Sequence, residues 1–213
     1  MLIKTLYQES INEIVNCLTE VKTACSKDIF IIPTKEYIEK ILDGYGRVFG
    51  AFYDNRLIGF ASVVFPKNGK HNLGTLLNLD KEELNKVVQF EHIAVLPEFQ
   101  NIGLGSILLD TIIKEYKDSY DYLISTISPK NIKSLSLAFD FEQQIIKQLN
   151  VYGVDRYVML RNLNKRFTIC NSITIDIYNT AKIIDLLNNG YCGISFNEKK
   201  TAIVFARGYY EKI

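Results

Sequence analysis

An apolar segment of this sequence runs through a proline turn and a glycine-bearing loop into a stretch with helical spacing. Residues 88–95 are mostly apolar, Pro97 follows them, and Gly103 and Gly105 precede an apolar stretch that reaches residue 117. The sequence therefore predicts a strand, a loop and an amphipathic helix in that order. The first turn of a helix leaves backbone N–H groups without intrahelical partners, at the positive end of the helix dipole. Such a junction suits a phosphate or a pyrophosphate.

The spacing of the glycines distinguishes this loop from two other phosphate-binding loops. A dinucleotide fingerprint needs a third glycine at position 108, where Leu108 stands, and no Gly-Lys-Ser/Thr triplet of a Walker loop follows. Residues 100–105 instead read Gln-x-x-Gly-x-Gly, after Ile-Ala-Val-Leu-Pro-Glu at 93–98. This order of strand, motif and helix resembles the acyl-CoA pyrophosphate loop of the GNAT acetyltransferase superfamily. The alternative is an ordinary strand–turn–helix connection in which the glycines serve only the turn.

The resemblance implies acetyl-CoA as cosubstrate and a set of residues that contact it. In this family the loop binds the diphosphate through main-chain amides, and glycines let the backbone approach the oxygens closely. Main-chain groups of the preceding strand pair with the pantetheine arm, and their amides could polarise the thioester carbonyl. The predicted cofactor-binding residues are Ile93, Ala94 and Val95 on the strand, and Gln100, Asn101, Ile102, Gly103, Leu104, Gly105 and Ser106 in the loop and first helical turn.

Glu91 is the candidate catalytic residue. It matches a carboxylate that many members of the family carry and that is often assigned as general base. An alkylamine has a pKa of about 10.4, so a base must remove its proton before the nitrogen can attack a thioester. Strand alternation places Gln89 and Glu91 on one face and His92 on the other. Two roles for Glu91 stay open: a general base, or a residue that fixes the strand or acts as counter-ion for the substrate ammonium.

A second matching segment begins where the strand at 122–127 ends. By resemblance, Asn131 and Ser134 are predicted to contact the cofactor, although Asn131 could equally be a plain helix N-cap. The tyrosine that often serves as acid for the leaving thiolate, seven residues after this Asn, is absent, because position 138 is Ala138. A thiol pKa of about 8.5 means that the thiolate can leave without an acid. Tyr152, Arg156 and Tyr157 could reach the site, and none of them is assigned a catalytic role.

The periodicity of apolar residues predicts the order of elements. We expect a strand at 1–6, helices starting at residue 10 and after Pro33, a hairpin at 47–53 and 57–65, and a short helix at 81–87. A strand at 122–127, a helix at 131–149 and an extended segment at 152–163 follow the motif. This order resembles the GNAT topology over about residues 1–163. It predicts an α/β fold, with a mixed β-sheet flanked by helices on both faces.

Residues 164–213 lie outside that pattern and predict a small C-terminal β-α-β-β extension. Alternating isoleucines at 173–177, a helical stretch from about residue 180 to Asn189-Gly190, and two further strands make up this unit. About 50 residues are marginal for an independent core. We therefore expect the extension to pack on the main domain or on a second subunit, and a homodimer would supply the latter.

Composition excludes several other classes of protein. The net charge is +1 over 213 residues, which gives no electrostatic case for binding nucleic acid. No apolar run approaches the roughly 20 residues that span a bilayer, so no membrane association is expected. The four cysteines form no Cys-x-x-Cys pair and no secretory signal follows Met1, which predicts reduced thiols and a cytoplasmic location. The two histidines lack metal-ligand spacing, so no metal is expected.

The sequence as a whole predicts an N-acetyltransferase that transfers an acetyl group from acetyl-CoA to a primary amine of a small molecule. Direct attack in a ternary complex is favoured, because no Cys or Ser lies in a nucleophile–base arrangement. The alternatives are a peptide or protein amine as acceptor, a non-catalytic acyl-CoA-binding or regulatory module, and a structural protein without cofactor.

Overall fold

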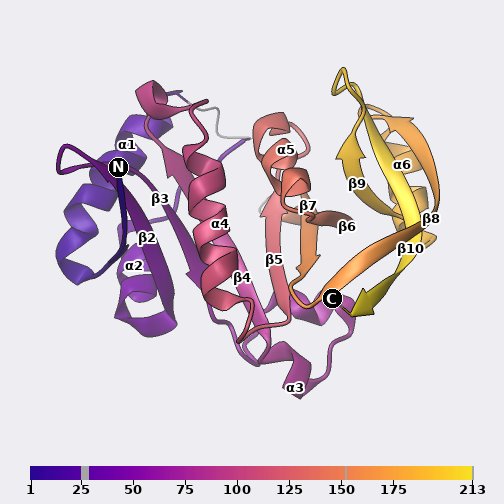
Figure 1. Cartoon of the computed structure of the whole chain (residues 1–213), viewed down its shortest axis with the longest axis horizontal. Coiled ribbons are helices and arrows are strands. Elements are labelled where there is room, and N and C mark those ends of the chain that lie inside the picture. Colours follow the sequence, from indigo (N-terminus) through magenta and orange to yellow (C-terminus); the bar gives the residue numbers. More distant parts are fainter. Residues whose placement is uncertain (25–28, 152, 213) are drawn as a thin grey trace. The chain divides into compact units, whose positions relative to one another are not determined.

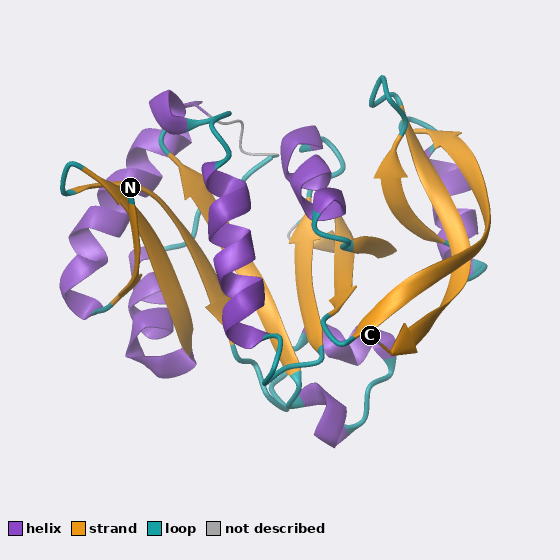
Figure 2. Cartoon of the chain, in the orientation of Figure 1, coloured by secondary structure: helices purple, strands orange, loops and turns teal. Residues whose placement is uncertain are grey.

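The chain folds into two compact units, Met1–Tyr120 and Asp121–Ile213. The computed structural model describes residues 1–24, 29–151 and 153–212. Figure 1 labels helices and strands of both units where there is room, and Figure 2 colours the chain by secondary structure.

The first unit contains an antiparallel sheet in the order β1-β2-β3-β4. The two central strands form the predicted hairpin, with Asp54 and Asn55 at its tip. Both residues have left-handed φ angles, of 46° and 61°, as a two-residue turn between twisted strands requires. The strands are β1 (Leu2–Leu6), β2 (Gly46–Tyr53), β3 (Arg56–Val64) and β4 (Val87–Val95).

Helices cover both faces of this sheet: α4 lies on one face, and α1 and α2 lie on the other (Figure 1). The Thr34 side chain caps α2 by accepting a hydrogen bond from the N–H of Tyr37 at 3.2 Å. The chain becomes helical at Gln8, earlier than the predicted start at Ser10. The elements are η1 (Gln8–Ser10), α1 (Ile11–Ala24), α2 (Lys35–Lys40), the π-helical turn η2 (Ile41–Tyr45) and α4 (Leu104–Tyr116).

Two short helices lie between β3 and β4: the 3-10 helix η3 (Leu73–Leu77) and α3 (Lys81–Leu84). Asp80 caps α3 in a capping box with Glu83, which confirms the short helix predicted there.

The second unit contains a sheet in the order β5-β7-β6-β9-β10-β8, and neighbouring strands in this order run antiparallel. Asn131 and Asn179 are the N-caps of its two helices. The elements are β5 (Tyr122–Ile127), α5 (Ile132–Asp140), β6 (Gln144–Val151), β7 (Val154–Asn162), β8 (Lys165–Asp176), α6 (Thr180–Asn188), β9 (Cys192–Phe196) and β10 (Ala202–Lys212).

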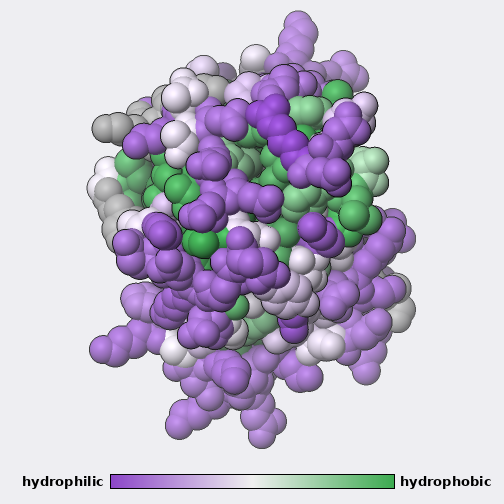
Figure 3. Space-filling view, turned by 90° about the vertical axis from the view of Figure 1, so that its left-hand side faces the viewer, coloured by the Kyte–Doolittle hydropathy of each residue, from purple (hydrophilic) through white to green (hydrophobic). Residues whose placement is uncertain are grey.

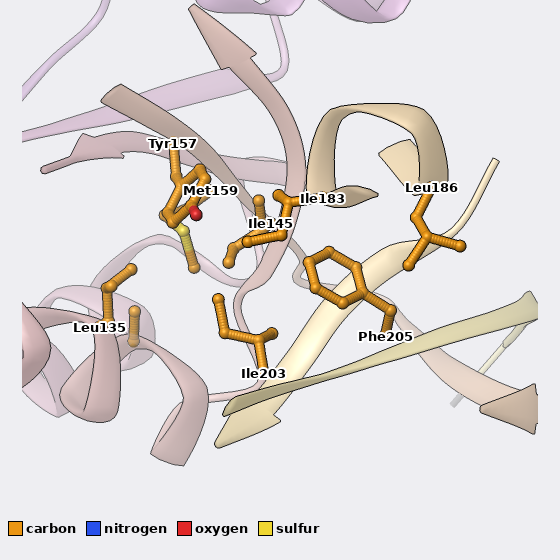
Figure 4. Packing of buried hydrophobic residues seen from close by; sticks show 9 residues of the cluster. Leu135, Ile145, Tyr157, Met159, Ile183, Leu186, Ile203 and Phe205 are labelled. Carbon is orange, nitrogen blue, oxygen red and sulfur yellow. The ribbon is translucent and has the colours of Figure 1, made fainter. Parts of the chain in front are cut away.

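The C-terminal extension has the predicted β-α-β-β order and shares one hydrophobic core with α5, β6 and β7 (Figure 4). Gly193 of β9 lies opposite Ile145 of β6, and a Cβ at Gly193 would come within 2.9 Å of the Ile145 side chain. A residue without a side chain therefore allows the two strands to approach. The buried members of this core are Leu135, Ala138, Ile145, Tyr157, Met159, Ile183, Leu186, Ile203 and Phe205.

The helix predicted at 131–149 is wrong in its second half. Helix α5 ends at Asp140, and β6 (Gln144–Val151) replaces the rest of the predicted helix. Glu142 takes a left-handed φ of 56° just after the helix, and the N–H of Gln143 then donates to the carbonyl of Ala138 at 2.9 Å. Glycine or asparagine usually occupies such a position. Because position 142 is a glutamate, the sequence carries no local signal that the helix ends there.

The predicted α/β fold, with helices on both faces of the sheet, is confirmed. The assignment of residues 1–163 to one functional domain remains a prediction. None of the described helices is long and apolar enough to cross a membrane. On the side of the molecule drawn in Figure 3 the surface is mainly hydrophilic, and apolar side chains show between the polar ones.

The shared core of the second unit predicts unequal effects for two adjacent isoleucines of α6. Ile183 is fully buried, whereas Ile184 is 40% exposed. We expect Ile183→Ala to lower the free energy of unfolding by about 2–5 kcal/mol, because it removes methylene contacts and leaves a cavity. Ile184→Ala should cost less than about 1 kcal/mol. Urea denaturation measures both, and equal losses would show that the extension does not contribute a packed core.

Candidate functional site

The loop between β4 and α4 is held in a fixed shape by short backbone hydrogen bonds. Leu96 is buried, and its carbonyl accepts from the N–H of Phe99 at 2.9 Å within the 3-10 turn η4 (Pro97–Phe99). Asn101 and Gly103 then adopt left-handed φ angles of 63° and 84°. Gly103 is the N-cap of α4, where the absence of a side chain removes the strain of this conformation.

The backbone N–H groups of residues 101–106 have no hydrogen-bond partner among the residues that the structure describes. The first N–H of α4 with a backbone acceptor belongs to Ile107, which donates to the carbonyl of Gly103 at 3.1 Å. Asn101, Ile102 and Gly103 are exposed, so their N–H groups are open to a ligand. A run of free amides at the N-terminus of a 13-residue helix is an anion-binding arrangement.

The strand before the loop directs two of its residues away from β3. The N–H of Leu96 donates to the carbonyl of Ile58 at 2.9 Å, and Cα partners run from Gly59–Val95 to Ser62–His92. In an antiparallel ladder, residues alternate between those whose backbone groups face the partner strand and those whose groups face away. Ala94 therefore pairs with β3, whereas Ile93 and Val95 present their N–H and C=O groups on the opposite edge of β4.

The side chains of Gln100 and Arg56 hold the loop around η4 in place. Gln100 donates from Nε2 to the carbonyl of Val95 at 3.0 Å, which closes the loop back onto the end of β4. Arg56 bridges Glu98 of the loop and Glu20 of α1, at 3.0 and 2.9 Å. The Gln100 side chain therefore supports the turn, whereas the free N–H groups belong to residues 101–106.

Glu91 lies at a β-bulge in the middle of β4. Cα partners run from Ser62–His92 directly to Val63–Phe90, so Glu91 is an extra residue without a partner on β3. The bulge interrupts the alternation that was expected to separate Glu91 from His92. Tyr37 of α2 interacts with both residues, through a hydrogen bond to Glu91 and a ring contact with His92 at 6.0 Å.

Polar side chains from several elements surround the Glu91 carboxyl group. Gln89 donates from Nε2 to Glu91 Oε1 at 2.7 Å, and Tyr37 also hydrogen-bonds the carboxyl group. Burial raises the pKa of Glu91 above its usual value, and these hydrogen bonds and the charge of His71 offset only part of that rise. Burial and the charge of Glu91 raise the pKa of Tyr45. Glu91 is thus a carboxyl group whose proton affinity is suited to accepting a proton.

His92 is a packed residue in this arrangement. Its side chain is 8% exposed, its Nδ1 lies 3.1 Å from the hydroxyl of Ser62, and Phe30 contacts the ring edge-to-face at 6.4 Å. These contacts give the imidazole a structural role between β3 and the aromatic side chains.

Asn131 and Ser134 lie in the second unit, at the start of α5. The Asn131 side chain accepts from the N–H of Ser134 at 3.0 Å, so the N-cap interpretation of Asn131 describes its contact in the structure. Ala138 is 1% exposed and belongs to the hydrophobic core. Cofactor contacts of Asn131 and Ser134 remain predictions, and position 138 offers no acid.

Two of the three other late residues considered from the sequence, Arg156 and Tyr157, have structural contacts. Tyr157 lies in the core, and burial raises its pKa to about 12. Arg156 is 8% exposed, donates from Nη2 to the carbonyl of Thr126 at 2.8 Å, and has its pKa lowered by burial. Tyr152 lies outside the described residues.

A cavity of about 160 Å³ lies elsewhere in the first unit. Its lining includes Thr5, Gly46, Arg47 and Phe65, at the end of β3 away from Ile58. Among the described residues, no group of three His, Cys, Asp or Glu side chains could hold a metal ion. The lining of this cavity includes neither Glu91 nor any residue of the loop between β4 and α4.

Sequence reasoning missed the links that hold Glu91. The bulge leaves no local sequence signal. The N–H of Leu73, which donates to the amide of Gln89, belongs to the first residue of η3, 16 positions earlier in the chain. The spacing of Gln89 and Glu91, two residues apart on a strand, was the one signal that could have indicated their contact.

The raised pKa of Glu91 predicts a pH-dependent stability change. Between the unfolded pKa of about 4.3 and the higher folded pKa, the folded protein binds more protons, so its free energy of unfolding falls as pH rises. Glu91→Gln removes this pH-dependent loss of stability, because glutamine does not ionise. We expect its stability gain over the native protein to be larger near pH 7 than near pH 4, as measured by urea denaturation. The exposed Glu9→Gln serves as control, and a pH-independent difference for Glu91→Gln would contradict the burial effect.

Comparison with known proteins supports the fold and identifies the family. The profile of the acetyltransferase (GNAT) family matches residues 11–141. No curated protein matches the sequence. An N-acetyltransferase of Staphylococcus aureus Mu50 is 18% identical with a TM-score of 0.60, over 76% of this chain and 98% of that one. The yncA protein of Salmonella typhimurium, solved with its cofactor acetyl-CoA, is 16% identical with a TM-score of 0.61, over 78% and 95%. The ribosomal-protein-S18-alanine N-acetyltransferase of Escherichia coli is 14% identical with a TM-score of 0.54, over 76% and 93%. The family match covers more than half of the sequence, and the chain belongs to the acetyltransferase (GNAT) family.

Proposed function

We propose that the chain transfers an acetyl group from acetyl-CoA to the primary amine of a small molecule. The observation that carries this proposal is the run of free N–H groups at residues 101–106, at the N-terminus of α4. A diphosphate would supply these amides with acceptors and place negative charge at the positive end of the helix dipole. A cytoplasmic location remains part of the proposal.

The residues expected to bind the cofactor fall into two groups. Asn101, Ile102, Gly103, Leu104, Gly105 and Ser106 would hold the diphosphate through their amides. Ile93 and Val95 direct their backbone groups away from β3 and would pair with the pantetheine arm as an added strand. Gln100 would support the loop by its bond to Val95.

Glu91 is proposed as the general base. The carboxylate removes a proton from the substrate ammonium, and the freed nitrogen lone pair attacks the thioester carbonyl carbon. The tetrahedral intermediate then expels the CoA thiolate, and the attacking nitrogen loses its second proton to water or to that thiolate. Glu91 returns the proton it accepted to solvent before the next turnover. The backbone N–H of Ile93 or Val95 would stabilise the oxyanion.

Direct attack is favoured over an acyl-enzyme on either of the two buried thiols. Burial raises the pKa of Cys17 and of Cys192 to about 12, which leaves almost no thiolate near neutral pH. Cys170 is exposed, and Cys25 lies outside the described residues.

A non-catalytic acyl-CoA-binding module is the second candidate, and the observation that favours it is Ala138. Its side chain is buried in the core of the second unit, so the acid that many family members carry at this position is absent. Release of CoA thiol from acetyl-CoA, measured across a panel of small amines and peptides with free amino termini, separates the two candidates. Tight acetyl-CoA binding without thiol release from any acceptor would favour the binding module.

Ser106→Asp tests the diphosphate site. An aspartate in the first turn of α4 favours the helix dipole, so the melting temperature should hold or rise. The same charge repels a diphosphate, and we expect acetyl-CoA affinity to fall about tenfold or more in calorimetric titration. Ala181→Asp, in the first turn of α6, adds the same charge at another helix and should leave the affinity unchanged. Unchanged affinity in Ser106→Asp would place the cofactor elsewhere.

Glu91→Gln tests the base. It removes the proton acceptor but preserves the size of the side chain. We expect kcat to fall about 100-fold or more and the acid-side inflection of the pH–rate profile to disappear. An unchanged profile would assign Glu91 to a structural or counter-ion role.

A further inference from the structure

The amide group of Gln89 connects the segment between β3 and β4 to the carboxyl group of Glu91. Its Oε1 accepts a hydrogen bond from the N–H of Leu73 at 3.0 Å, and its Nε2 donates to Glu91 Oε1 at 2.7 Å. Gln89 is 7% exposed, so water competes little for either bond. A backbone N–H can only donate, and it therefore fixes which end of the amide is oxygen. The amino group is consequently turned toward Glu91.

The position of Leu73 is itself fixed by the buried side chain of Asn72, which is 1% exposed. Asn72 donates from Nδ2 to the carbonyls of Lys67 and Leu84, the latter at 2.9 Å, and its Oδ1 accepts from the N–H of Gly74 at 2.8 Å. These bonds tie the two ends of the segment together around Leu73. The N–H of Leu73 therefore meets Gln89 from a rigid turn.

We propose that Gln89 is a positioning residue whose locked amide holds the Glu91 carboxyl group in one orientation and stabilises its ionised form. This inference rests on the proposed role of Glu91 as base. An amino group can donate to a carboxylate, but it cannot accept from the O–H of a protonated carboxyl group. The lock at Leu73 prevents the amide from flipping to present its oxygen instead. Gln89 thus opposes the effect of burial and keeps Glu91 available as a proton acceptor.

Other groups also face the Glu91 carboxyl group and must stay in place during a test. Tyr37 of α2 hydrogen-bonds it, His71 acts on it by its charge, and Tyr45 at the end of η2 responds to its charge. Variants at Gln89 and Leu73 leave these three side chains unchanged.

The experiment measures the pKa of Glu91 directly, by carbon NMR of the full-length protein with labelled glutamate side chains and no substrate. Glu91→Gln identifies the resonance. Gln89→Met keeps the length of the side chain but removes both hydrogen bonds. We expect it to raise the pKa of Glu91 by about one pH unit, and to move the acid-side inflection of kcat/KM by the same amount.

Two further variants separate the lock from the amide itself. Leu73→Pro removes the N–H and replaces the half-buried leucine side chain by the proline ring. Leu73 is the first residue of η3, where proline is tolerated, and Asn72 before it already has the extended conformation that proline requires. Without this N–H, the Gln89 amide can flip and present its oxygen to Glu91. The pKa of Glu91 should therefore rise, as in Gln89→Met. Gln89→Glu keeps the acceptor for Leu73 and replaces the donor by a second carboxyl group, so the pair must share a proton and the Glu91 midpoint should rise further.

Ser62→Ala is the matched control, because it removes a buried hydrogen bond to His92 on the neighbouring strand. It should leave the pKa of Glu91 unchanged. A Glu91 pKa within about 0.3 unit of the native value in Gln89→Met would overturn the inference. If Gln89→Met does not fold, Leu73→Pro decides by the same criterion, because it releases the Gln89 amide without adding a charge near Glu91. A shifted NMR pKa with an unmoved rate profile would overturn Glu91 as base and still support the effect of Gln89 on its ionisation.

Discussion

The amides at the start of α4 cannot be satisfied within the helix, and this constraint governs the architecture of the first unit. A helix that begins on a left-handed glycine after a tight 3-10 turn directs its first N–H groups outward. Bonds from Gln100 and Arg56 hold the turn against β4 and α1. The apolar residues of α4, above all Leu104 and Leu108, anchor the helix on the sheet. The residues that pack α4 on the sheet and the residues whose N–H groups stay free therefore lie in one short segment of the chain.

The bulge at Glu91 places a carboxyl group where burial opposes its charge. Such a group reduces stability near neutral pH, and the structure surrounds it with donors that recover part of that loss. A proton acceptor with a raised pKa and fixed orientation is the usual result of this balance in enzymes. Tyr37 contacts the ring of His92 and hydrogen-bonds Glu91, so one side chain of α2 contributes to the surroundings of both residues.

Most of the fold followed from local patterns, because hairpin tips, helix caps and apolar periodicity act over a few residues. The Asp54-Asn55 turn, the Thr34 cap and the strand–loop–helix at 88–116 illustrate this. The end of α5 could not be predicted from a local pattern, since Glu142 occupies a left-handed position usually held by glycine. For the candidate site, the positions of the free amides could be predicted. The bulge and the Leu73–Gln89 bond could not, because both depend on contacts between distant parts of the chain.

The core that joins α5 and β7 to α6 and β10 has a consequence for folding during synthesis. Its members extend from Leu135 to Phe205, so the apolar faces of α5, β6 and β7 leave the ribosome well before β10 can cover them. A nascent chain that stops short of β10 exposes this surface to other chains and to chaperones. We therefore expect the long β8–β10 pair, which joins distant parts of the chain, to form late in folding of the second unit.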